Sequence, residues 1–140
     1  MNPILSAGVL IGILCSAWTF VLGFTGLYKS PSANVVFISV AMAIEIVVLT
    51  WGLRRTAAEG RAYVGQILAG TMMAIVGGVI IIASSLFFTT VVFPASSATP
   101  MAQAMSGFVG TLVTGIVGSA IISIVVRRRG GAVHLPETQR

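Results

Sequence analysis

Four long apolar stretches follow one another along the chain, separated by short polar or charged segments. They cover about residues 3–28, 34–53, 63–90 and 105–126. Each is long enough to supply the roughly 20 apolar residues that a helix needs to cross a bilayer. Within the third stretch, residues 76–82 lack the alternation of polar and apolar positions that is typical of a transmembrane β-strand. The pattern therefore predicts four transmembrane helices.

We expect these helices to pack as one compact all-α bundle, a single transmembrane domain over residues 1–129. Basic residues or proline mark the predicted breaks, with Lys29 after the first helix, Arg54 after the second and Pro94 after the third. Residues 130–140 are short and mostly polar, and they include a Gly-Gly pair. We expect them to form a mobile cytoplasmic tail, as short polar chain ends commonly do.

The composition agrees with a membrane protein. Of the 140 residues, 56% are hydrophobic and 8% are charged, whereas a soluble domain carries about 25% charged residues. Eight Lys/Arg and three Asp/Glu residues cannot cover a water-facing surface. This excludes a soluble catalytic domain and a disordered chain. The one cysteine, Cys15, excludes an intramolecular disulfide and is read as a small apolar residue.

The basic residues predict the orientation. Only Lys29 falls on one side of the predicted bundle, and the other side holds Arg54, Arg55, Arg61, Arg127, Arg128, Arg129 and Arg140. Cytoplasmic loops carry the excess of Lys and Arg, so both termini are predicted to be cytoplasmic. The net charge of +5 needs no nucleic-acid partner to explain it. A second, compatible interpretation is that these arginines, above all Arg127 to Arg129, bind anionic lipid head groups.

Small residues at a spacing of four allow transmembrane helices to approach closely. The first helix carries Gly8, Gly12 and Ser16, and the third carries Gly70, Ala74 and Gly78. The fourth helix carries two such rows: Gly107, Thr111, Gly115 and Ser119, and beside them Gly110, Thr114 and Gly118. Either both rows pack inside one monomer, or one of them meets another copy or a different subunit.

Glu45 is the only formally charged residue inside a predicted span. It lies eight residues from Leu53, which is roughly 12 Å along a helix, and its short side chain cannot reach the interface. An acidic residue at the centre of a membrane helix costs roughly 2.5–3.5 kcal/mol on insertion scales. Such a residue raises a functional hypothesis by default.

No basic residue lies at the same depth, and desolvation disfavours the charged form, so we expect a neutral, hydrogen-bonded Glu45. Possible partners at suitable depth are Ser16, Trp18, Thr19, Thr114 and Ser119. Gln66 is a further polar group, expected to bond across helices or to interfacial water. Three roles remain open for Glu45: a hydrogen bond that fixes helix register, a proton or cation site in a transport path, or a contact to a partner subunit or lipid.

The sequence lacks residues arranged for catalysis. The chain has no Asp, its one His lies in the predicted tail, and no phosphate-binding glycine motif is present. We therefore expect no enzyme activity, cofactor or metal. The leading hypothesis is a non-enzymatic membrane subunit that packs helices with itself or with other subunits. The alternative is a small homo-oligomeric transporter or channel that uses Glu45.

One region resembles a known family. The exit from the second helix, Trp51-Gly52-Leu53-Arg54-Arg55, is followed by Arg61, by Tyr63-Val64-Gly65-Gln66 and by Gly70. Together with the basic stop after the fourth helix, this resembles a family of small four-span bacterial inner-membrane proteins of unknown function. The resemblance implies a bacterial inner-membrane location and carries no implication for chemistry.

Overall fold

A computed structural model of the chain describes residues 2–26, 32–92 and 100–130. The elements are α1 (Pro3–Thr25), α2 (Ala33–Ala58), α3 (Tyr63–Phe87), the π-helical turn η2 (Phe88–Val92) and α4 (Pro100–Gly130). The helical segments Pro3–Thr25, Val35–Ala58, Tyr63–Val92 and Ala104–Val126 are each long and apolar enough to cross a membrane. The prediction of an all-α, multi-pass membrane protein is thereby confirmed. The tail, residues 131–140, lies outside the described residues.

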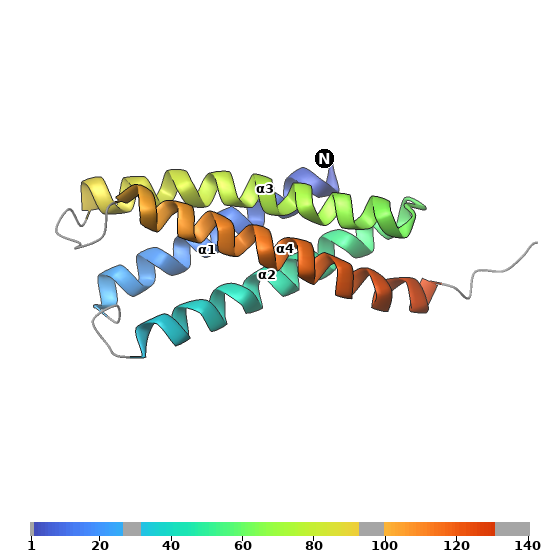
Figure 1. The fold of residues 1–140 in the computed structure, drawn as a ribbon, viewed down its shortest axis with the longest axis horizontal. Coiled ribbons are helices and arrows are strands. Elements are labelled where there is room, and N and C mark those ends of the chain that lie inside the picture. The colour runs from blue at the N-terminus through green and yellow to red at the C-terminus, as the bar shows by residue number, and fades with distance from the viewer. Residues whose placement is uncertain (1, 27–31, 93–99, 131–140) are drawn as a thin grey trace, which may run out of the picture.

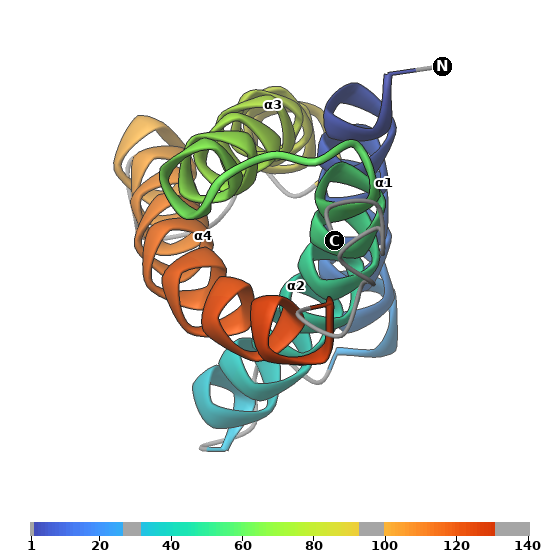
Figure 2. The same cartoon turned by 90° about the vertical axis from the view of Figure 1, so that its right-hand side faces the viewer.

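The four long helices form a bundle in which neighbours in sequence run in opposite directions (Figure 1). Viewed end-on, they follow the order α1, α2, α4, α3 around the bundle (Figure 2). The most extensive contacts are those of α3 with α4 and with α1, and α2 packs against α1 and α4. Both views show the N-terminal half of α2 diverging from the N-terminal half of α4.

Two helix ends differ from the prediction because backbone geometry, and not hydropathy, terminates a helix. The first helix ends at Thr25 and not near residue 28, because Gly26 takes a left-handed φ of 69° and its N–H bonds the Gly23 carbonyl. The second runs past Leu53 to Ala58. Arginine is a good helix former once the chain leaves the apolar region.

The last two helices also extend beyond their apolar stretches. The third continues from α3 into the π-helical turn η2, where the hydroxyls of Thr89 and Thr90 donate hydrogen bonds to backbone carbonyls one turn earlier. The fourth begins at Pro100, five residues earlier than predicted, and continues through the arginines to Gly130. Proline is favoured in the first turn of a helix because its missing N–H has no partner there.

Glycines let α1 and α3 approach closely. A Cβ atom at Gly8 would lie 2.8 Å from the backbone oxygen of Met73, and one at Gly12 would lie 2.6 Å from Ile80 Cβ. The small residues of α1 therefore face α3, where larger side chains fill the space that each glycine leaves.

The two small-residue rows of α4 lie in different surroundings. In the first row, Gly115 lies directly against Ala74 of α3, and Ser119 lies against Gly70. Gly107 of the same row faces Ile81, and Gly78 of α3 faces Phe108. This row is therefore packed inside the chain, and Gly115 is not available for contact with another subunit.

The second row is only partly covered. A Cβ atom at Gly118 would lie 3.6 Å from Leu49 Cδ1 of α2, an ordinary packing distance. At Gly110 no described atom of a neighbouring element lies within 4 Å of the Cβ position. Leu49 of α2 thus covers this row at Gly118, whereas the described neighbours leave it open at Gly110.

Candidate functional site

Glu45 lies on the inward face of α2, near the middle of the helix. It shares this face with Val48, Leu49 and Leu53, whose spacing of three and four residues brings them to one side. These apolar side chains belong to the buried core, and they carry Glu45 inward with them. The carboxyl side chain is 4% exposed.

The hydrogen-bond partner of Glu45 comes from α4. The hydroxyl of Thr111 donates to Oε1 of Glu45 over 2.8 Å, and both residues are buried. Thr114, three residues further along α4, presents a second hydroxyl to the carboxyl group. The predicted small-residue row of α4 included Thr111 only as a packing position, so the structure gives this residue an additional role.

The second carboxyl oxygen of Glu45 has no such partner. Oε2 is buried and has no hydrogen-bond partner among the residues that the structure describes. The Cys15 thiol of α1 lies within electrostatic reach of the carboxyl group. Among the residues that the structure describes, no Lys or Arg side chain pairs with Glu45. The site is thus a single carboxyl group at the junction of α1, α2 and α4, with the hydroxyls of Thr111 and Thr114 beside it.

Most of the partners predicted for Glu45 bond elsewhere. Ser16 donates to Ser84 of α3 over 2.8 Å, and Thr19 donates to the backbone oxygen of Cys15. Ser119 donates to the carbonyl one turn back in its own helix. The Trp18 indole nitrogen is buried without a hydrogen-bond partner. Of the predicted set, Thr114 alone lies at the carboxyl group.

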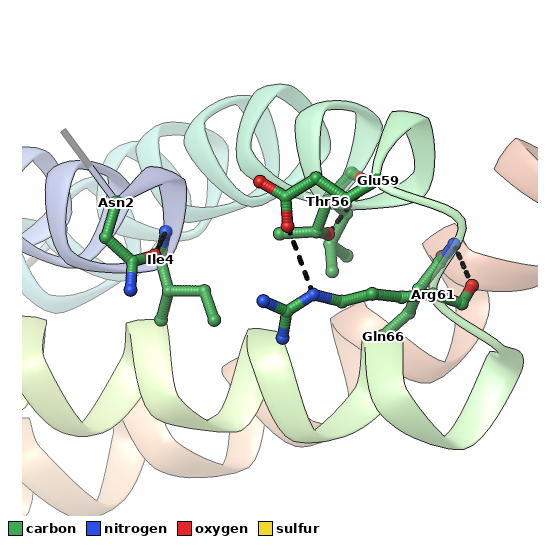
Figure 3. A network of polar contacts seen from close by, with 7 residues as sticks. Asn2, Ile4, Thr56, Glu59, Arg61 and Gln66 are labelled. Atoms are coloured by element: carbon green, nitrogen blue, oxygen red, sulfur yellow. Dashed lines mark hydrogen bonds and ion pairs between the residues drawn. The ribbon is translucent and has the colours of Figure 1, made fainter.

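Gln66 also lies away from Glu45. Its side-chain nitrogen donates to the Arg61 carbonyl over 3.4 Å, a bond across the start of α3 (Figure 3). This nitrogen does not form the bond across helices that was one of the two predicted interactions, and the predicted bond to interfacial water stays a prediction. Among the described residues the buried side-chain oxygen has no partner. Gly70 of α3 faces Ser119 of α4. Gln66 lies one turn before Gly70, and Ser123 lies one turn after Ser119. Because α3 and α4 run antiparallel, Gln66 and Ser123 lie on the same side of this contact. The Ser123 hydroxyl is likewise buried without a partner, and the sequence analysis missed this residue.

The arginines at this end of the bundle have varied surroundings. Arg61 pairs with Glu59 at 3.2 Å, and both side chains are largely exposed (Figure 3). Such a solvated pair contributes little to stability. The Arg55 guanidinium lies over the Trp51 ring, 4.1 Å from its centroid. The side chains of Arg127, Arg128 and Arg129 lie outside the described residues.

Comparison with known proteins adds no identification. A scan against protein-family models, a search of curated proteins and a search of solved structures found no match to this chain. The family resemblance and the bacterial inner-membrane location therefore stay predictions. Among the described residues, no group of three or more His, Cys, Asp or Glu side chains is placed to hold a metal ion.

Proposed function

We propose that this protein is a non-enzymatic, multi-pass subunit of a membrane assembly. It associates with another transmembrane helix through the exposed side of α4 that carries Ser106 and Gly110. In this proposal the end of the bundle that carries Arg54, Arg55 and Arg61 faces the cytoplasm. The excess of arginine at that end supports this orientation.

The observation that carries the proposal is the open space beside Gly110. This glycine lies within the membrane span Ala104–Val126, and among the described residues no neighbouring element comes within 4 Å of its Cβ position. Ser106 and Gly110 are both exposed. These two small residues lie four apart on the outside of the bundle, the spacing that brings two membrane helices into close contact.

Exposed apolar side chains do not provide comparable support. Val35, Ile38 and Val113 are exposed. Lipid tails are as favourable a surrounding for such apolar side chains as another helix is, so their exposure does not indicate an interface. A glycine and a serine gain nothing from lipid. They gain backbone contact and weak Cα–H···O hydrogen bonds from a neighbouring helix.

The first prediction concerns Gly110→Leu. The leucine side chain would hold the partner helix away, so the assembly is expected to dissociate to a chain of 14.5 kDa. Fold and expression are expected to stay unchanged, because the side chain enters open space. Native mass spectrometry of protein released gently from its own membrane measures both masses.

Gly65→Leu is the matched control. Gly65 lies in α3, and its nearest neighbour is Arg61 Cβ, 3.7 Å from the Cβ position. This variant is expected to keep the assembled mass. A wild-type protein that is released as a single chain would contradict the proposed function, and an unchanged mass for Gly110→Leu would place the interface elsewhere. The masses of the bound chains show whether the partner is a second copy or a different subunit.

A second candidate function is a homo-oligomeric transporter or channel in which Glu45 binds a proton or a cation. The observation that favours it is Oε2 of Glu45, a buried acceptor with no hydrogen bond in the described structure. A buried polar atom without a partner is costly, and binding a proton or a cation would satisfy it. Polar membrane residues of this kind mark many ion and proton pathways.

This candidate predicts pH-dependent flux in liposomes, which Glu45→Gln abolishes. Glutamine keeps an oxygen that accepts the Thr111 hydrogen bond, so the fold is expected to survive, but the amide does not titrate. Helix content by circular dichroism checks the fold, and protein-free liposomes give the background. Equal flux in wild type and Glu45→Gln would contradict a transport function that depends on Glu45.

A further inference from the structure

A shallow hollow lies on the outer face of the arginine-bearing half of α2. Its lining residues are Ile46, Val47, Thr50, Trp51, Arg54, Arg55 and Ala58, and its volume is about 540 Å³. The spacing of three and four residues places them all on one face of a single helix. The core residues of α2 occupy the opposite face, so the hollow opens away from the bundle.

The lining changes in character along the helix. Ile46 and Val47 make one end apolar, whereas Arg54 and Arg55 make the other end positively charged. From Ile46 to Arg54 is eight residues, roughly 12 Å at 1.5 Å per residue. Trp51 lies between the two ends, and its ring is covered by the Arg55 guanidinium.

The positive end lacks a counter-charge. In the part of the chain that the structure describes, neither Arg54 nor Arg55 forms an ion pair with a carboxylate, although Arg61 pairs with Glu59. Both arginine side chains are exposed. A phosphate group is the anion that a membrane surface presents at this depth, and arginine binds phosphate strongly through its planar fork of donors.

We propose that this hollow binds one anionic phospholipid. Arg54 and Arg55 hold its phosphate, and an acyl chain descends past Trp51 along Ile46 and Val47. The charge complementarity selects the head group, and the apolar end selects a lipid over a free phosphate ester. This proposal is independent of the α4 contact, because it concerns a different helix.

The experiment compares lipid binding to wild type and to the double variant Arg54→Gln/Arg55→Gln. Native mass spectrometry in detergent counts bound phosphatidylglycerol at increasing lipid concentration. The double variant is expected to lower the affinity for the tightest-bound lipid roughly 30-fold, the combined effect of two basic residues at a membrane surface. Arg61→Gln is the matched control, because Arg61 lies outside the hollow, and it is expected to bind as wild type does.

Three results would overturn the proposal. A loss of about fivefold in Arg61→Gln, the effect of one basic residue at a membrane surface, would show that overall charge attracts the lipid without a defined site. Equal binding of phosphatidylcholine would remove the role of the anionic head group. Full competition by glycerol phosphate would show a phosphate site that does not use the apolar end. Circular dichroism verifies that the double variant keeps its helix content.

Discussion

Gly115→Leu is expected to disrupt the fold of the single chain. Gly115 lies directly against Ala74 of α3, so even a Cβ atom has no space there. The neighbouring contact of Gly70 with Ser119 prevents the two helices from sliding apart locally. Overpacking of a tight core typically costs about 1–3 kcal/mol, and here the backbones themselves must separate, which favours the upper end, about 3 kcal/mol. We expect the free energy of unfolding to fall by at least about this amount.

Unfolding in mixed micelles with increasing dodecyl sulfate, followed by circular dichroism, measures this change. Gly110→Leu provides the matched control, because it makes the same substitution in the same helix at a position that faces open space. Its stability as a monomer is expected to equal that of the wild type. Equal stability of both variants would show that the close contact between α3 and α4 is absent.

Thr111→Val is expected to give the second-largest loss of stability. Valine has nearly the shape of threonine but cannot donate the 2.8 Å hydrogen bond to Glu45. Both carboxyl oxygens of Glu45 would then be buried without this donor. Hydrogen bonds between membrane helices and the cost of an unsatisfied buried acceptor together suggest a loss of about 1–2 kcal/mol. The same unfolding assay measures it.

A double-mutant cycle separates the hydrogen bond from general packing. In Glu45→Leu/Thr111→Val both polar groups are replaced by apolar side chains, so no acceptor is left unsatisfied. Such a replacement is often neutral or stabilising, and we expect the double variant to recover most of the loss caused by Thr111→Val. Strictly additive effects of the two single changes would contradict a direct interaction between the side chains.

The transmembrane spans were predictable because each depends on hydropathy, which sums over consecutive residues. An apolar run of about 20 residues specifies a membrane helix whatever its neighbours are. The helix ends were less predictable, since Arg54 and Arg55 end the apolar run without ending the helix. The helix itself ends at Ala58, near Gly60, whose φ of 77° few other residues adopt.

The burial of Glu45 was predictable from its depth, but its partner depends on the rotation of α4 about its axis. The two rows of small residues in α4 have similar composition, so hydropathy does not indicate which row faces inward. One signal was available in the sequence. The row with Thr111 continues through Ser119 to Ser123, all buried, whereas the other row ends at Gly118. The longer row is the internal one.

The glycine face of α1 has a consequence for biosynthesis. The face of α3 that packs against these glycines is synthesised much later. Ser16 of α1 and its hydrogen-bond partner Ser84 of α3 are 68 residues apart in the sequence. At about 5–20 residues per second, translation takes roughly 3 to 14 s to supply that partner. Until then α1 has only α2, with which it shares a smaller contact. During this interval the hairpin of α1 and α2 lacks its main packing partner, and a chain that stalls before α3 leaves the glycines of α1 uncovered in the bilayer.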